Sequence, residues 1–208
     1  LRMMSIHMNK RLHLDREGIT KSQYRKAYEQ TVGSGRFFLY NHFGSLDSEN
    51  LISRLYYLAT ACECDFIILD HVSIAISGQV DGDERRIIDN LMTTLRSLAE
   101  KTEVGLLIVS HLRKKNNQQK AHEEGATVSP SDLRGSHSIY QLSDIVVALE
   151  RNLMEDSENI TRIKVLKNRF SGDTGASGAL HYNKETGRLL PVDPDIADDF
   201  SGGEEEMF

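Results

Sequence analysis

Apolar residues recur at helix spacing in two long stretches of the chain. The first begins at Asp47 and ends near Cys62, and the second begins at Asp83, a residue type that commonly caps helices. Their apolar positions are Leu51, Ile52, Leu55, Leu58 and Ala59 in the first, and Ile87, Ile88, Leu91, Met92, Leu95 and Leu98 in the second. We predict one amphipathic helix in each stretch. Residues 1–32 are more polar, and predict two shorter helices that are broken near Gly18.

Continuous apolar runs predict strands between and after these helices. The runs at 65–70 and 106–111 each end in a polar residue and are typical of strands buried on both faces of a parallel sheet. Further strands are predicted at 36–40, 144–151 and 161–167, with a short helix at 137–142 and a hairpin of 179–183 and 188–190 turned at 184–187. The order of elements indicates an α/β fold with a mostly parallel sheet flanked by helices.

Residues 112–135 are polar and show no apolar period. We therefore expect a long loop between two strands. Loops of this length are usually functional or disordered.

Charge is distributed unevenly along the 208 residues. The formal net charge is −6, with 25 Lys and Arg against 31 Asp and Glu. Seven of the acids lie after Pro191, where there is no basic residue, and the first 192 residues hold 24 acids against 25 bases. We predict a folded domain over residues 1–192 and a disordered acidic tail over residues 193–208.

Several classes of protein are excluded or disfavoured by composition. The longest apolar runs, 66–69 and 104–109, are far shorter than the roughly 18–20 residues that a membrane helix needs. There is no secretory leader, and Cys62 and Cys64 are too close together to staple a domain or to form a metal site alone. We expect a cytoplasmic, reducing setting. Because the chain begins at Leu1, we also expect it to be the C-terminal piece of a longer protein.

Two polar strand ends carry the first chemical signal. Asp70 and His111 each follow a predicted parallel strand, and ligands bind at the carboxyl ends of such strands. A carboxylate at this edge can hold a water of hydrated Mg²⁺, and a histidine can sense a phosphate. The alternative is that Asp70 caps the next turn and His111 merely ends a strand.

A phosphate-binding loop would normally accompany that carboxylate. The glycine-containing segments 33–35 and 171–175 both lack the lysine that such a loop requires. The sequence therefore contains only half of a nucleotide site.

A series of motifs resembles the ring-shaped replicative helicases. They lie at residues 65–73, 83–86, 108–112, 121–125, 132–136, 141–144, 149–152 and 167–175, and the resemblance extends from roughly Phe38 to Leu190. It is strongest to the helicase half of phage gene 4-type primase-helicases, which are related to bacterial DnaB and mitochondrial Twinkle. It implies a RecA-like P-loop NTPase core that here lacks its first strand and phosphate-loop segment.

The same resemblance implies roles for seven residues in nucleotide binding and hydrolysis. Asp70 would coordinate Mg²⁺ through water, His111 would sense phosphate, and Gln141 would report the γ-phosphate to the DNA loop. Lys167 and Arg169 would reach the nucleotide of a neighbouring subunit, with Arg169 as the arginine finger. Arg151 and Tyr182 would sandwich the nucleotide base. Each of these residue types is also common on ordinary helix and strand surfaces.

Two further segments would bind partners. The polar loop carries Lys114, Lys115, Asn116 and Lys120, and Arg134 follows in the next motif. These side chains suit a sequence-independent grip on single-stranded DNA, and the family places its channel loops here. The tail residues Glu204, Glu205, Glu206 and Phe208 would contact the replicative polymerase, although acidic tails also simply keep proteins soluble.

Together these features predict the C-terminal part of a phage replicative DNA helicase. It would form a homo-hexamer in the host cytoplasm, use ATP or dTTP with Mg²⁺, and translocate 5′ to 3′ while unwinding duplex DNA. Because the phosphate loop and the catalytic glutamate are absent from this chain, the isolated piece is expected to be inactive. A non-hydrolysing module that binds DNA or polymerase is the alternative, and a RecA-like recombinase is a weaker third hypothesis.

Overall fold

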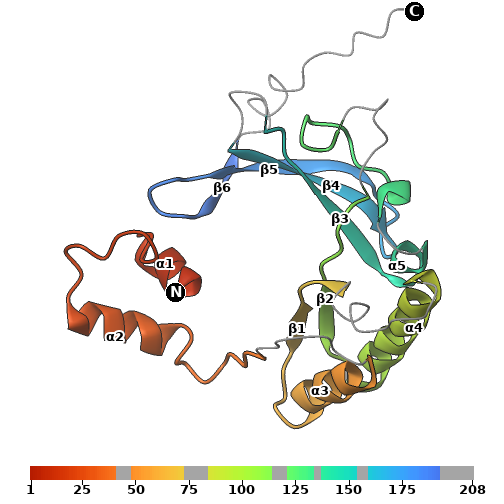
Figure 1. Ribbon diagram of the computed structural model, residues 1–208, viewed down its shortest axis with the longest axis horizontal. Helices are drawn as coiled ribbons and strands as arrows, with labels where there is room; N and C mark the ends of the chain where they lie inside the picture. The colour runs from red at the N-terminus through yellow and green to blue at the C-terminus, as the bar shows by residue number, and fades with distance from the viewer. Residues whose placement is uncertain (41–47, 73–83, 114–120, 134–136, 154–158, 193–208) are drawn as a thin grey trace, which may run out of the picture.

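The computed structural model describes residues 1–40, 48–72, 84–113, 121–133, 137–153 and 159–192. In this part of the chain, two strands and their helices form one layer, a second sheet extends it, and a helical pair lies at the far side (Figure 1).

A parallel strand pair and two helices form the main core. Strand β1 (Phe66–Leu69) pairs in parallel with β2 (Gly105–Ile108), and α3 (Ser48–Thr60) and α4 (Glu84–Thr102) cover one face of the pair (Figure 1). The predicted apolar stripes face inward, and Ile88 and Leu95 of α4 are each 1% exposed. Because α4 connects two parallel strands, it is the crossover helix that the sequence predicts.

The four remaining described strands form an antiparallel sheet. Their order is β3 (Ile145–Glu150), β4 (Ile160–Asn168), β5 (Gly175–Tyr182) and β6 (Leu189–Val192). Helix α5 (His137–Leu142) leads directly into β3. The antiparallel share is larger than the sequence indicated, because short turns join β4 to β5 and β5 to β6, and a short turn can only join antiparallel neighbours. The hairpin turned at residues 184–187 is confirmed.

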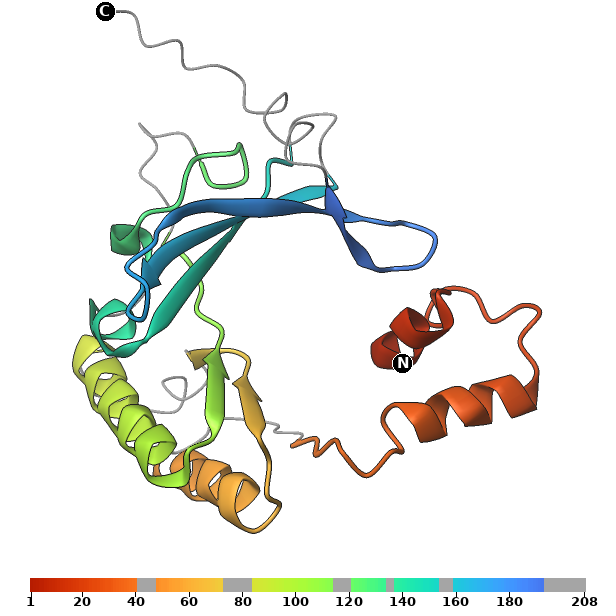
Figure 2. The ribbon, with the colours of Figure 1, turned by 180° about the vertical axis from the view of Figure 1, so that it is seen from behind.

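The N-terminal residues form a small helical pair with its own core. Helices α1 (Arg2–Met8) and α2 (Lys21–Gln30) enclose Met4, Leu12 and Ala27, and the break between them includes Gly18, as predicted. Figure 2 shows this pair on the opposite side of the molecule from α3 and α4. One link between this pair and the sheet is the bond from the Arg188 guanidinium to the Asn9 side chain, 2.8 Å long.

The prediction that β1 and β2 are buried on both faces is wrong for the described chain. Ile67 and Leu69 face the helices and are buried, whereas Phe66 is 71% and Ile68 70% exposed. Leu107 of β2 is exposed as well. Side chains alternate between the faces of a strand, and no described element covers this second face.

The predicted strand at 36–40 is also wrong. These residues have no regular structure, and Phe37, Phe38, Leu39 and Tyr40 are all largely exposed. A strand needs a neighbour for its backbone N–H and C=O groups, and none of the described strands pairs with this segment. The Tyr40 ring instead lies 5.8 Å from the Arg54 guanidinium of α3.

Candidate functional site

The carboxyl ends of β1 and β2 meet, as the sequence predicted. The amide of Val109 donates to the Leu69 carbonyl and that of Val72 to the Val109 carbonyl, each at 2.9 Å. These bonds hold the segments that carry Asp70 and His111 side by side. The rings of His71 and His111 lie edge to face, with centroids 4.3 Å apart.

His71 is the residue at this edge to which sequence reasoning assigned no role. Its Nδ1 is buried and has no hydrogen-bond partner among the residues that the structure describes. Its position directly after Asp70 was the signal that could have identified it. Together, Asp70, His71 and His111 present a carboxylate and two imidazoles at one strand edge.

The donor set at this edge fits a magnesium ion held through water. Asp70 is exposed, so its carboxylate can accept from coordinated water molecules. Over the described ranges, no group of three or more His, Cys, Asp or Glu side chains could enclose a metal ion. A single outer carboxylate is therefore what this part of the chain offers.

Helix α5 and the end of β4 bring Gln141 and Lys167 together. The Lys167 ammonium donates to the backbone carbonyls of Tyr140 at 2.8 Å and of Gln141 at 2.9 Å, and it lies 5.2 Å from the Tyr140 ring centroid. The Tyr140 hydroxyl donates in turn to the Leu166 carbonyl at 3.2 Å. Burial, with a smaller contribution from the neighbouring Arg169, lowers the pKa of Lys167. The amide side chain of Gln141 remains exposed.

Arg169 lies at the same end of the sheet, where β4 enters its turn. Its side chain is 51% exposed and donates to Asp144 Oδ1 at 3.2 Å. The other carboxylate oxygen of Asp144 accepts from Arg96 of α4 at 2.5 Å. Bonds to Glu100 and Asp144 raise the pKa of Arg96, the larger effect coming from Glu100. Sequence reasoning assigned no role to Asp144 or Arg96.

Arg151 and Tyr182 lie at the opposite end of the sheet. Arg151 directly follows β3, and Tyr182 ends β5, with β4 between them. The six steps along β4 from Thr161 to Lys167 correspond to about 20 Å at the usual rise per strand residue. The structure therefore keeps this pair apart from Lys167 and Arg169.

The predicted DNA-binding and partner-binding residues lie outside the described residues. These are Lys114, Lys115, Asn116, Lys120 and Arg134, together with Glu204, Glu205, Glu206 and Phe208. The described residues just before both DNA loops are nevertheless joined. Leu112 and Leu133 form an antiparallel bridge, and the Arg113 amide donates to the Asp132 carbonyl at 2.7 Å. Positions 113 and 133 therefore lie together on the body.

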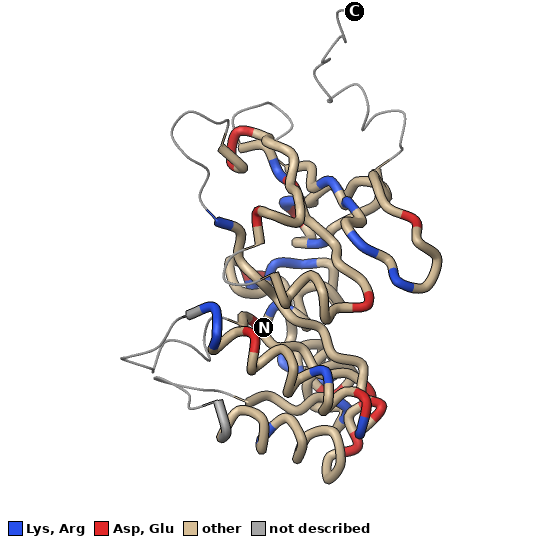
Figure 3. The backbone as a smooth tube through the Cα atoms, turned by 90° about the vertical axis from the view of Figure 1, so that its right-hand side faces the viewer, with Lys and Arg blue, Asp and Glu red and all other residues tan. Residues whose placement is uncertain are grey.

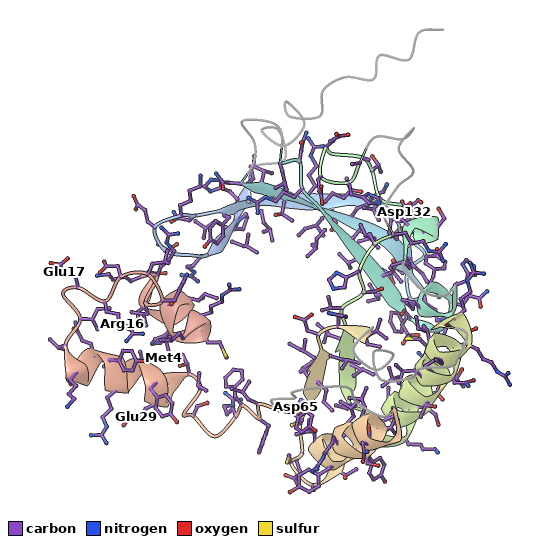
Figure 4. All side chains as sticks on the ribbon, in the orientation of Figure 1. Met4, Arg16, Glu17, Glu29, Asp65 and Asp132 are labelled. Carbon is purple, nitrogen blue, oxygen red and sulfur yellow. The ribbon has the colours of Figure 1, made fainter. Side chains whose placement is uncertain are left out.

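A surface hollow of about 630 Å³ lies elsewhere, on α2. Its lining residues are Lys21, Ser22, Tyr24, Arg25 and Tyr28. Figure 4 places α2, marked by Glu29, well away from Asp65 at the start of β1. The hollow contains none of the predicted site residues.

Among the helices of the described ranges, none is both long and apolar enough to span a membrane. Basic side chains of these ranges occur on the helices as well as on the sheet, with acidic ones between them (Figure 3). Charges of both signs are thus interspersed over the described part of the molecule.

Solved structures support the fold that this geometry describes. A solved helicase ATPase domain superposes with a TM-score of 0.69 at 17% identity, covering 92% of this chain and 69% of that one. A structure of a DnaB-like replicative helicase and its interactions with primase gives a TM-score of 0.73 at 16% identity, covering 92% and 47%. These likenesses confirm the RecA-like α/β class.

Sequence comparison identifies the family. A DNA helicase/primase of Enterobacteria phage T3 is 44% identical over 179 residues, which is 86% of this chain and 30% of that protein. The chain thus spans less than a third of the relative it matches. The model of the DnaB-like helicase C-terminal domain matches residues 2–190. The chain therefore belongs to the DnaB-like helicase C-terminal domain family.

Proposed function

We propose that this chain is the C-terminal part of a replicative DNA helicase that couples NTP hydrolysis to 5′ to 3′ translocation on single-stranded DNA and to duplex unwinding. The observation that carries the proposal is the meeting of Asp70 and His111 at the carboxyl edge of β1 and β2. This is the edge at which open α/β sheets bind their ligands.

The strand edge supplies one half of the nucleotide site. Asp70 would hold water molecules of a bound Mg²⁺, an ion that neutralises charge on the transferred phosphoryl group. His111, steadied by the edge of the His71 ring, would contact the terminal phosphate of ATP or dTTP. The exposed Gln141 amide would sense the same phosphate and pass its state to the DNA loop.

Arg169 and Lys167 would act on the nucleotide of a neighbouring subunit. The half-exposed Arg169 guanidinium has five N–H donors, so it can keep its bond to Asp144 and still bind a phosphate. Arg151 and Tyr182, which would hold a base, are about 20 Å away along the sheet. This separation supports two different nucleotides, as hydrolysis between the subunits of a homo-hexameric ring requires.

The rest of the site would come from the part of the protein that this chain does not contain. A phosphate loop and a catalytic glutamate are needed, and neither is present in the sequence. The uncovered apolar face of β1 and β2 supports this view, because such strands are stable when both faces are covered. We expect the isolated 208-residue chain to hydrolyse no NTP, which is also what a non-hydrolysing DNA-binding or polymerase-binding module would do.

DNA and polymerase would bind at separate places. The bridge between Leu112 and Leu133 brings the starting points of both predicted DNA loops together, which favours a joint grip on the phosphate backbone. The acidic tail would contact the replicative polymerase through charge and the terminal Phe208. The protein would act in the cytoplasm of the infected bacterium.

The decisive experiment replaces Arg169 by Ala in the intact protein that contains this chain. We expect the kcat for DNA-stimulated NTP hydrolysis to fall by about 10³-fold or more, because an arginine finger stabilises charge in the transition state. The matched control is Arg25→Ala on α2, where the side chain is 82% exposed and pairs only with Glu29 among the described residues. Hydrolysis by Arg169→Ala at the parental rate would refute the trans assignment. NTPase activity of the isolated chain above background would refute its expected inactivity.

A further inference from the structure

Asp144 joins two arginines from distant parts of the chain. It lies between the end of α5 and the start of β3, and its two carboxylate oxygens bond different guanidinium groups. Oδ1 accepts from Arg169 at 3.2 Å and Oδ2 from Arg96 at 2.5 Å. One carboxylate therefore links α4 to the end of β4.

Arg169 is fixed by Asp144 at its backbone as well as at its side chain. The Arg169 amide donates to the Asp144 carbonyl at 2.8 Å. The turn that follows is closed by its own bonds, since the Asn168 side chain accepts from the amides of Phe170 and Ser171 at 3.0 and 3.3 Å. The base of the Arg169 side chain is thus held in place, and Asp144 limits the rotation of its far end.

Asp144 is itself held by a rigid element. Arg96 also donates to Glu100 at 2.7 Å within α4, and both Arg96 and Asp144 are only about one third exposed, at 30% and 34%. The apolar stripe of α4 packs in the core that includes Ile67 and Leu69 of β1. The position of Arg169 is therefore referred to the same core that supports the Asp70 edge.

The contribution of this pairing to stability is expected to be small. Ion pairs at partly exposed positions are screened by water and salt and contribute little to folding. Orientation is a different matter, because a guanidinium that is already aligned needs no reorganisation when charge develops on a phosphoryl group. The geometry of the bridge suits alignment better than it suits folding.

We propose that Asp144 is a positioning residue that aligns the Arg169 guanidinium for the nucleotide of the neighbouring subunit. The inference rests on the proposed function, in which Arg169 acts in trans. Asp144 touches no nucleotide in this scheme and acts only through Arg169.

The first test compares Asp144→Asn with Arg96→Gln in the intact protein. Asp144→Asn keeps the shape and removes the charge, and we expect kcat for DNA-stimulated NTP hydrolysis to fall about 10- to 100-fold with KM nearly unchanged, since small misalignments have effects of this size. Arg96→Gln breaks only the link to α4, and we expect a smaller loss of about two- to fivefold, because the carboxylate still bonds Arg169. Asp144→Glu restores the charge and should recover part of the rate. Equal losses of kcat in Asp144→Asn and Arg96→Gln, or a kcat that rises in Asp144→Asn, would overturn the proposal.

A double-mutant cycle separates positioning from a structural role. If Asp144 acts through Arg169, then adding Asp144→Asn to Arg169→Ala should lower kcat by no more than about twofold further. Losses that multiply would mean that Asp144 acts on folding or on its own subunit's site. Thermal unfolding midpoints of all variants show whether each one folds.

Mixed rings give a second readout that does not depend on any single variant being active. Asp70→Asn subunits have a disabled site but an intact Arg169, whereas Asp144→Asn subunits have an intact Asp70 and a misaligned Arg169. Equal mixing should restore activity at about a quarter of the subunit interfaces, because each heterologous interface combines the two halves at random. Absence of recovery would overturn the proposal.

The parent protein distinguishes the two levels of failure. If the parent hydrolyses NTP and Arg169→Ala abolishes the activity, the proposed function stands and only the role of Asp144 is being tested. If Arg169→Ala is fully active, the proposed function fails before Asp144 is considered.

Discussion

Lys167 shows how one side chain is constrained at the residue scale. The resemblance assigns its ammonium to a neighbouring subunit, and within this chain the ammonium bonds two carbonyls of α5. Carbonyl oxygens solvate a cation less completely than water does, so burial lowers the pKa of Lys167 below the usual 10.5. If Lys167 also acts in trans, it must leave these carbonyls or share its three N–H donors with a phosphate.

The lowered pKa of Lys167 predicts a pH dependence of stability. At lower pH the buried ammonium is charged in both states and its full cost falls on the folded chain. As pH rises through the folded-state pKa toward 10.5, the folded chain loses the proton first and that cost disappears. The free energy of unfolding of the parent, measured in urea, should therefore rise between about pH 8 and about pH 10 relative to that of Lys167→Met.

The exposed position Lys26 on α2 supplies the control for this measurement. Lys26→Met should change the free energy of unfolding by a similar amount at both pH values. If the parent and Lys167→Met keep a constant difference over this range, the shifted titration of Lys167 is excluded.

At the scale of elements, helix α4 organises the described core. It connects the parallel strands β1 and β2, packs beside α3 and α5, and carries Arg96 on its outer side. Its apolar stripe repeats at helix spacing, which is why the sequence predicted the element correctly. The segment 36–40 failed because a strand depends on a neighbour that local periodicity does not reveal.

The core role of α4 predicts a large effect of truncating Leu95. This side chain is 1% exposed, and Leu95→Ala should lower the free energy of unfolding by about 2–5 kcal/mol, because it removes buried methyl groups and leaves a cavity. Leu14, which is 65% exposed, provides the matched control, and Leu14→Ala should cost less than about 0.5 kcal/mol. Chemical denaturation of the chain measures both, and equal effects would contradict the described core.

At the scale of the whole molecule, charge is divided between a nearly neutral body and an acidic tail. The overall charge of −6 would argue against a DNA-binding protein, whereas removing the seven acids of residues 193–208 leaves a body of about +1. Basic and acidic residues alternate over the described surface (Figure 3). A local grip by the loop lysines, with a separate acidic contact for a protein partner, is consistent with this division.

The division predicts that the two binding functions can be separated. Deleting residues 193–208 from the intact protein should weaken binding to the replicative polymerase by about tenfold or more and leave the Kd for single-stranded DNA within about twofold. Replacing Lys114, Lys115 and Lys120 by Ala should do the reverse, and should lower the salt dependence of DNA binding by about one unit of slope for each lost phosphate contact. Fluorescence anisotropy with labelled DNA and a polymerase pull-down measure the two effects. Loss of both functions in either variant would contradict the division.

The sequence by itself determined the order of the elements, the apolar stripes of α3 and α4, the polar ends of β1 and β2, and the motifs that identify the family. Each of these is a local property, because periodicity and strand ends are set by neighbouring residues. The tertiary structure decided which face of β1 is covered and which partners the charged side chains have. Arg96 and Asp144 are 48 positions apart, and only the packing of α4 against α5 brings them within hydrogen-bond distance. The bridge to Arg169 follows from that packing, since no pattern along the chain specifies a contact between segments so far apart.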